Sequence, residues 1–260
     1  MLPRVLTALV GAPLLLLFAW LGGLYLAVAV AVLILLVQNE LVRLLSELRP
    51  HRGLVFFGGL VLAGGAFLYP VQFPGAALAG LLLVYLVAMV VFFPRFSPAS
   101  LAGTVLAAFY PGLLAYLYLL RVLPDGWQWF LVVLLATWAF DTFGYFTGKV
   151  AGRTRLTPAL SPKKTVEGLA GGVLAAVGTT GLAGLVLLGM WTWPLVVLGL
   201  LVAAAAQTGD LLASAVKRFA GVKDAGRLLP GHGGVLDRFD SLLFTAPIAY
   251  YYIYWFVYTG

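Results

Sequence analysis

The sequence contains no cysteine, only two histidines and few charges. Charged residues make up 10% of its 260 residues, against about 25% in an ordinary soluble domain. The absence of cysteine excludes a disulfide, a thiolate metal site, a catalytic thiol and a palmitoyl anchor. Any metal must therefore be held by oxygen atoms or by the two histidines, and the shortage of charge excludes a water-soluble globular protein.

Hydrophobic residues, by contrast, make up 63% of the sequence, and a membrane-spanning helix needs about 20 residues. We predict an all-α, polytopic integral membrane protein with about nine transmembrane helices, forming one membrane domain over residues 1–260. Its halves are an N-terminal helical half, 1–125, and a catalytic half, 126–260. The nine apolar runs cover residues 5–20, 24–39, 54–70, 74–94, 101–120, 127–148, 166–189, 193–216 and 241–258.

The basic residues predict the topology of these helices. Nine spans would place fifteen of the sixteen Lys and Arg residues on one side of the membrane and only Arg121 on the other. The positive-inside rule then predicts an N-in, C-out protein with its polar loops in the cytoplasm. In a membrane protein, the formal charge of +7 indicates topology and contact with anionic lipids and not a nucleic-acid partner. We expect a multi-pass protein of the cell membrane.

Three acidic residues lie at or near the ends of strongly apolar runs in the second half, namely Asp141, Glu167 and Asp210. Each would cost about 3 kcal/mol inside a membrane unless it has a partner. An interhelical ion pair explains any single one of them as well as a functional role does. Because all three acids lie beside the two most basic loops, a functional site is favoured over three separate ion pairs.

The first basic loop contains Ser161, Pro162, Lys163, Lys164 and Thr165. Thr165 can cap the helix that follows, whose first N–H groups carry the positive end of the helix dipole. Lysines beside such a helix start predict an anion site, with phosphate as the candidate ligand. A capped positive-inside loop would explain these residues equally, but it would not explain Glu167 just inside the helix.

The second basic segment, residues 214–240, is the densest in polar groups. Asp237 and Asp240 are three apart, so on a helix they share a face and two carboxylates can reach one hard cation. Residues 230–234 are too glycine-rich for a helix and can form a turn whose N–H groups approach phosphate. Acids, bases and a glycine turn together indicate a nucleotide-polyphosphate site at the membrane surface. The charged cytosolic loop of a transporter is the alternative.

Two other features are assigned structural roles. Glu40, Arg43 and Glu47 share a helix face on which each carboxylate can meet the arginine, and we interpret them as a cytosolic extension of the second helix that stops before Pro50. A group of glycines on one face of the seventh run is expected to permit close helix packing. These are Gly168, Gly171 and Gly172.

The segment Ser214 to Asp240 resembles the signature of the phosphatidate cytidylyltransferases, or CDP-diacylglycerol synthases: S-x-x-K-R-x-x-x-x-K-D-x-x-x-x-x-x-P-G-H-G-G-x-x-D-R-x-D. Upstream, residues 161–168 are similar to the family's S-P-x-K-T-x-E-G element. Residues 141–145 are similar to its D-x-x-A-Y element, with Gly144 in place of the usual alanine. The resemblance covers about residues 138–245, and the first half matches only in being hydrophobic.

The resemblance implies an integral membrane enzyme, homodimeric, that converts CTP and phosphatidate to CDP-diacylglycerol and pyrophosphate. It implies Mg²⁺, with Mn²⁺ as a substitute, held by Asp210 and Asp237, and K⁺ as a second cation. With the residue types above, it gives a catalytic set of Asp210, Asp237, Lys223, Asp224, Arg238 and Asp240. The phosphate-binding candidates are Ser161, Lys163, Lys164, Thr165, Lys217, Arg218, His232, Gly233 and Gly234. Asp141 and Glu167 are expected to support and orient these groups.

Two other functions remain open from the residues. A CTP-dependent lipid-alcohol kinase would use similar metal and phosphate groups but would transfer the γ-phosphate, so that its products would be CDP and a lipid phosphate. A membrane transporter would also have Gly- and Pro-broken helices with acids near the membrane. Against a transporter, the polar residues gather in two loops on one predicted side.

Overall fold

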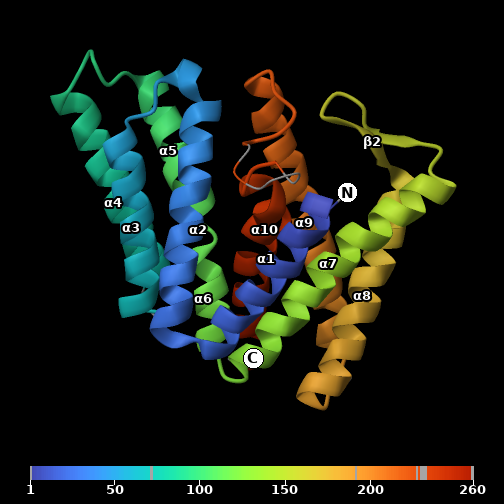
Figure 1. The fold of residues 1–260 in the computed structure, drawn as a ribbon. Helices are drawn as coiled ribbons and strands as arrows, with labels where there is room; N and C mark the ends of the chain where they lie inside the picture. The colour runs from blue at the N-terminus through green and yellow to red at the C-terminus, as the bar shows by residue number, and fades with distance from the viewer. Residues whose placement is uncertain (1, 71–72, 191, 227, 229–232, 259–260) are drawn as a thin grey trace. The chain divides into compact units, whose positions relative to one another are not determined.

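The computed structural model describes residues 2–70, 73–190, 192–226, 228 and 233–258. This part of the chain is almost entirely helical (Figure 1). Its α-helices are α1 (Leu2–Leu21), α2 (Gly23–Leu44), α3 (Arg52–Leu68), α4 (Phe73–Val91), α5 (Pro98–Gly112), α6 (Ala115–Val122), α7 (Gly126–Ala151), α8 (Val166–Leu188), α9 (Trp193–Phe219) and α10 (Leu236–Ile253). The described chain also contains a 3₁₀ turn, η1 (Ser46–Leu48), and a π-helical turn, η2 (Tyr254–Tyr258). Its two strands are β1 (Arg155–Thr157) and β2 (Ser161–Thr165).

The predicted apolar runs coincide with helices, and one of them is broken. The run 101–120 forms α5 and α6 with a turn at residues 113–114. Pro111 has no N–H to donate to the preceding turn of helix. Leu113 and Leu114 donate instead to the carbonyls of Tyr110 and Pro111, at 3.2 and 3.0 Å. The backbone therefore tightens at this point and α6 starts anew.

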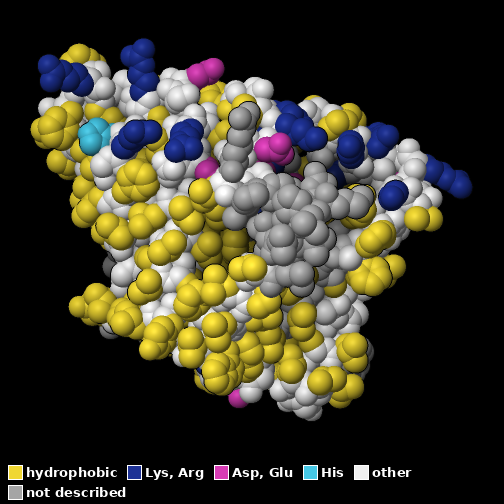
Figure 2. Space-filling view, viewed as in Figure 1, with side chains coloured by type: hydrophobic (Ala, Val, Ile, Leu, Met, Phe, Trp, Pro, Cys, Tyr) yellow, Lys and Arg dark blue, Asp and Glu magenta, His cyan; other side chains and the backbone are white. Residues whose placement is uncertain are grey.

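The chain is a helical, multi-pass membrane protein. Within the described residues, five segments are long and apolar enough to cross a membrane: Gly23–Leu44, Pro98–Val122, Gly126–Ala151, Val166–Leu188 and Trp193–Phe219. Shorter apolar helices cover Val10–Leu21, Arg52–Leu68 and Ala77–Val91. Hydrophobic side chains cover much of the face in Figure 2, and large ones such as Leu174 and Trp193 are exposed, as a lipid-facing surface requires.

The chain forms two compact units, and the first contains residues 1–119 and 219–238. Within it α2 packs against α1, α3 and α5, and α3 also packs against α4 (Figure 1). The side chains that α2 buries recur at helical spacing along one face. They are Leu26, Val30, Ile34, Val37 and Leu41. Residues 219–238 thus group with the N-terminal helices, although the sequence placed them in the half 126–260.

The second unit contains residues 120–218 and 239–260. Its most extensive contact is between α7 and α8, which the antiparallel hairpin of β1 and β2 connects (Figure 1). A Cβ atom at Gly168 would lie 2.8 Å from the carbonyl oxygen of Gly144, and one at Gly172 would lie 2.8 Å from the Phe140 ring. The glycines of α8 therefore allow the two helices to touch, which confirms the packing role predicted for them.

Candidate functional site

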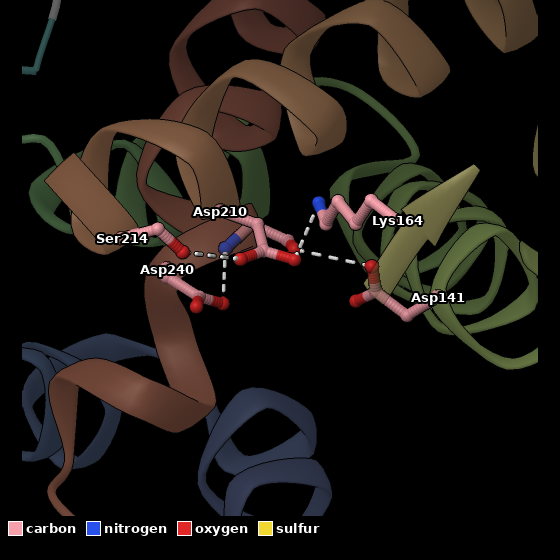
Figure 3. Close-up of polar contacts among 6 residues, drawn as sticks. Asp141, Lys164, Asp210, Ser214 and Asp240 are labelled. Atoms are coloured by element: carbon pink, nitrogen blue, oxygen red, sulfur yellow. Dashed lines mark hydrogen bonds and ion pairs between the residues drawn. The ribbon is translucent and has the colours of Figure 1, made fainter. Parts of the chain in front are cut away.

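Three aspartates of the second unit converge from three different helices. Asp141 lies on α7, Asp210 on α9 and Asp240 on α10, and Figure 3 shows their side chains approaching one another with Asp210 in the middle. We call these three residues the acidic cluster. In the sequence they are separated by 69 and 30 positions, so only the fold brings them together.

Asp210 has two side-chain partners. Its Oδ2 forms an ion pair with Nζ of Lys164, on β2, at 2.6 Å (Figure 3). Its Oδ1 accepts a hydrogen bond from the hydroxyl of Ser214, one turn later on α9, at 3.4 Å. The Asp210 and Lys164 side chains are 30% and 22% exposed, so both remain accessible to a ligand.

Asp141 and Asp240 are connected through Ser241. The Ser241 hydroxyl donates to Oδ1 of Asp141 at 3.3 Å, and its backbone N–H donates to Oδ1 of Asp240 at 2.8 Å. Asp240 also interacts electrostatically with Asp210, Asp141 and Lys217. Three carboxylates beside Lys164 and Lys217 make a site with an excess of negative charge, which a cation would relieve.

The donor atoms of the acidic cluster suit magnesium. Within the described part of the chain, no three Asp, Glu or His side chains are close enough to hold a metal ion by themselves. Mg²⁺ does not need such a cage, because it is usually bound by one or two carboxylates together with substrate phosphates and water. A half-exposed Asp210 with carboxylates on both sides fits that requirement.

The hairpin and the start of α8 hold Lys164 beside this cluster. Thr165 caps α8, since its hydroxyl accepts the N–H of Gly168 at 3.1 Å, as the sequence predicted. The Glu167 carboxylate accepts the backbone N–H groups of Arg153 and Thr154 at 3.0 and 3.2 Å. Both side chains are therefore used to order the loop before α8.

The other phosphate-binding candidates of this unit lie on the hairpin and near the end of α9. Ser161 begins β2 and is half-buried, Lys163 is exposed on the same strand, and Lys217 is half-buried near the end of α9. The Arg218 side chain donates through Nε to the carbonyl of Leu160 at 3.4 Å. The start of the second basic segment thus contacts the hairpin through Arg218, while the contact of these residues with phosphate stays a prediction.

The glycine-rich segment before α10 lies in the first unit and is organised around Asp237. Oδ2 of Asp237 accepts the backbone N–H groups of Ala225 and Gly234, at 2.8 and 2.9 Å. Gly233 has φ +84°, and a Cβ atom there would lie 2.7 Å from the same oxygen. The Gly234 N–H, predicted to face a phosphate, is therefore donated to Asp237.

The remaining predicted residues of this segment are exposed. Lys223, Asp224 and Arg238 face solvent, and Asp224 lines a pocket of about 250 Å³ together with Arg43 and Glu47. His232 lies outside the described residues. Asp237 and Asp240 are both in the first turns of α10, but Asp237 belongs to the first unit with this segment and Asp210 to the second. A metal site that pairs Asp210 with Asp237 stays a prediction.

Three residues of these two sites were missed in the sequence. Ser214 and Ser241 contact the acidic cluster, and their positions four after Asp210 and one after Asp240 were a usable signal. Glu40 is buried on α2, and its carboxylate accepts N–H groups of Val235 and Leu236. The sequence had assigned Glu40 to a solvated helix face with Arg43, because nothing local indicates a partner almost two hundred residues away.

Comparison with known proteins places these sites in a family context. The sequence model described as the cytidylyltransferase family matches residues 2–256. A phosphatidate cytidylyltransferase of Staphylococcus epidermidis is 33% identical over 257 residues, covering 94% of this chain and 96% of that protein. One from Staphylococcus aureus strain COL is 32% identical over 252 residues, with the same coverage. One from Thermotoga maritima is 47% identical over 126 residues, covering 46% of this chain and 47% of that protein. Similarity thus extends into the first half of the chain.

Proposed function

The chain belongs to the cytidylyltransferase family, and we propose that it transfers the cytidylyl group of CTP to phosphatidate. The products are CDP-diacylglycerol and pyrophosphate, and the chain is an enzyme of the nucleotidyltransferase class that serves phospholipid synthesis. Relatives that carry the name phosphatidate cytidylyltransferase match nearly the whole chain. The observation in the structure that carries the proposal is the acidic cluster with Lys164 paired to its central member.

The reaction joins two anions and needs little proton transfer. A phosphate monoester loses its second proton at about pH 6, so a phosphatidate oxygen is already a nucleophile near neutrality. It attacks the α-phosphorus of CTP in line, a new P–O bond forms, and the bond from that phosphorus to the bridging oxygen of pyrophosphate breaks. The main barrier is electrostatic, because negative charge accumulates on the phosphates while they approach.

The residues of the second unit suit this task. Asp210, together with Asp237 of the first unit, would hold Mg²⁺, which would supply positive charge to the phosphates and to the leaving pyrophosphate. K⁺ is an additional cation of the proposal, and Mn²⁺ a substitute for Mg²⁺. Lys164 is held by Asp210 at 2.6 Å, so its ammonium group is already at the cluster when a phosphate arrives. Asp141 and Asp240 orient the cluster through Ser241.

The lipid substrate has a suitable surface beside this cluster's helices. A groove of about 730 Å³ on α7 and α8 is lined mainly by apolar and small side chains, and Glu167 lies at its polar end. We place an acyl chain of phosphatidate along this groove, among Phe143, Leu174 and Leu182. The hydrocarbon chain can then stay in an apolar environment while the head group reaches the hairpin.

The arrangement in the membrane is part of the proposal. Nine spans with the N-terminus inside and the C-terminus outside put fifteen of the sixteen basic residues, including both basic loops, in the cytoplasm, where CTP is available. We also propose that the chain works as a homodimer. A reporter fused after Gly260 tests the orientation, and it is expected to report the non-cytoplasmic side; a cytoplasmic signal contradicts the nine-helix topology.

The activity is tested by following the α-phosphate of CTP. Purified protein in detergent receives phosphatidate, Mg²⁺ and α-labelled CTP, and a lipid alcohol in a parallel reaction. We expect the label to enter the lipid as a CDP group with one pyrophosphate released per transfer. Label left in water as CDP, with phosphate gained by the lipid alcohol, would establish a kinase. Uptake of a solute with no turnover of CTP would establish a transporter.

A further inference from the structure

The carboxylate of Glu40 holds the start of α10. Its Oε1 accepts the backbone N–H of Val235 and its Oε2 accepts that of Leu236, both at 2.8 Å. The first N–H groups of a helix have no partner within the helix, and a carboxylate satisfies them and complements the helix dipole. Glu40 is only 4% exposed. A residue of the second helix therefore supplies the cap of the last one.

Two glycines of the signature segment make room for this carboxylate. A Cβ atom at Gly226 would lie 2.7 Å from Oε1 of Glu40, and one at Gly234 would lie 2.6 Å from Oε2. Real Cβ atoms essentially never come so close to another heavy atom. Any side chain at these positions would displace Glu40, so the segment is shaped to receive it from both sides.

The same segment sets the position of Asp237. Val235 and Leu236, the residues that Glu40 binds, lie between Gly234 and Asp237, and Oδ2 of Asp237 accepts the Gly234 N–H. Asp237 thus closes a short turn whose two central N–H groups are fixed by Glu40. If the Glu40 bonds are lost, the N–H groups of Val235 and Leu236 lose the contact that ties this turn to α2, and the position of Asp237 becomes less constrained.

The end of α2 offers a matched comparison for Glu40. Glu47 lies seven residues later, on η1, and is exposed. It lines the small pocket with Asp224 and Ala225, so it is close to the same segment. Glu47 therefore tests the effect of removing a negative charge near the segment without removing the cap of α10.

We propose that Glu40 is a positioning residue for the cytidylyl transfer, because it fixes residues 233–237 and thereby the direction of the Asp237 carboxylate. The kinetic part of this inference rests on the proposed function. Its structural part does not, since it concerns the backbone of residues 233–237.

The test compares Glu40→Gln with Glu47→Gln in purified full-length protein. We expect Glu40→Gln to lower kcat about 10- to 100-fold, the effect of removing a group that orients a metal ligand, and to raise the Mg²⁺ concentration needed for half-maximal activity. Hydrogen–deuterium exchange of the amides of residues 233–237 should become faster. Glu47→Gln should leave all three quantities at wild-type values. Glu40→Asp keeps the charge but retracts the carboxylate, so it should behave as Glu40→Gln does.

Gly226→Ala is the second variant, for the case in which Glu40→Gln does not fold. It crowds the carboxylate without removing it, and the same pattern of exchange and kinetics is expected. Exchange at residues 233–237 that stays at the wild-type rate overturns the proposal. Faster exchange with unchanged kcat and unchanged Mg²⁺ requirement also overturns it, since the role is then only structural. A wild-type protein that makes no CDP-lipid instead contradicts the proposed function, and the exchange experiment still decides whether Glu40 holds the segment.

Discussion

The acidic cluster and the pair Glu40 and Asp237 use carboxylates in opposite ways. In the acidic cluster, Asp210 contacts the side chains of Lys164 and Ser214 and is 30% exposed. In the other region, Glu40 and one oxygen of Asp237 each accept two backbone N–H groups. Side-chain partners can rotate away when a ligand arrives, whereas backbone donors are fixed. The first region therefore leaves its central carboxylate accessible to a ligand, whereas the second uses backbone hydrogen bonds to fix the direction of Asp237.

Asp210→Asn should have the largest effect on activity. The change removes the negative charge at the middle of the acidic cluster while keeping the size of the side chain. We expect turnover to fall on the order of 10³-fold, because a catalytic metal contributes several kcal/mol to the transition state. CDP-lipid formation measures the loss, and unchanged hydrogen exchange at residues 233–237 shows that the other region is intact. Activity near the wild-type level would remove Asp210 from the metal site.

Asp237→Asn should lower turnover to a similar extent, but with a second signature. The amide cannot accept the N–H groups of Ala225 and Gly234 as the carboxylate does if its NH₂ group faces them. We therefore expect faster amide exchange at these two residues, in protein that elutes from gel filtration in detergent as the wild type does. If turnover is lost but amide exchange does not change, the Asp237 carboxylate does not hold the loop, and the contrast drawn between the two regions fails at this residue.

Lys164→Met should have an intermediate effect. It keeps the length of the side chain and removes the charge that pairs with Asp210. We expect kcat/KM for CTP to fall about 100-fold, the lower end of the loss when one charge-stabilising donor is removed. Lys149→Met, at the exposed end of α7, is the matched control and should keep wild-type kinetics. Equal losses in the two variants would indicate a general effect of basic charge.

Thr165→Ala should have the smallest effect. It removes the cap of α8, which costs about 1 kcal/mol of stability, and it loosens the end of β2 next to Lys164. Ser97→Ala removes the corresponding cap of α5 and serves as the control. Both variants should lower the thermal midpoint in detergent slightly, and only Thr165→Ala should raise KM for CTP. Identical KM values would separate the hairpin from substrate binding.

Local patterns predicted the helices and the contacts between near neighbours. The apolar runs predicted the helices and Thr165 was recognised as a cap, whereas the run 101–120 was predicted as one helix and forms two. Glu40 could not be assigned in this way. Its partners Val235 and Leu236 are backbone N–H groups 195 and 196 residues away, and a backbone donor leaves no mark in the sequence at its own position. Gly226 and Gly234 make room for the Glu40 carboxylate, but this role is visible only in the folded structure.

Manganese binding tests the central claim most directly. Mn²⁺ is titrated into the wild-type protein and into Asp210→Asn, each with and without CTP. Electron paramagnetic resonance measures the bound ion, and a titration of CTP without protein gives the share of Mn²⁺ that the nucleotide binds by itself. The account predicts a protein-bound Mn²⁺ in the wild type that Asp210→Asn loses. Equal binding by the two proteins would contradict it, since the acidic cluster would then not be where the metal is held.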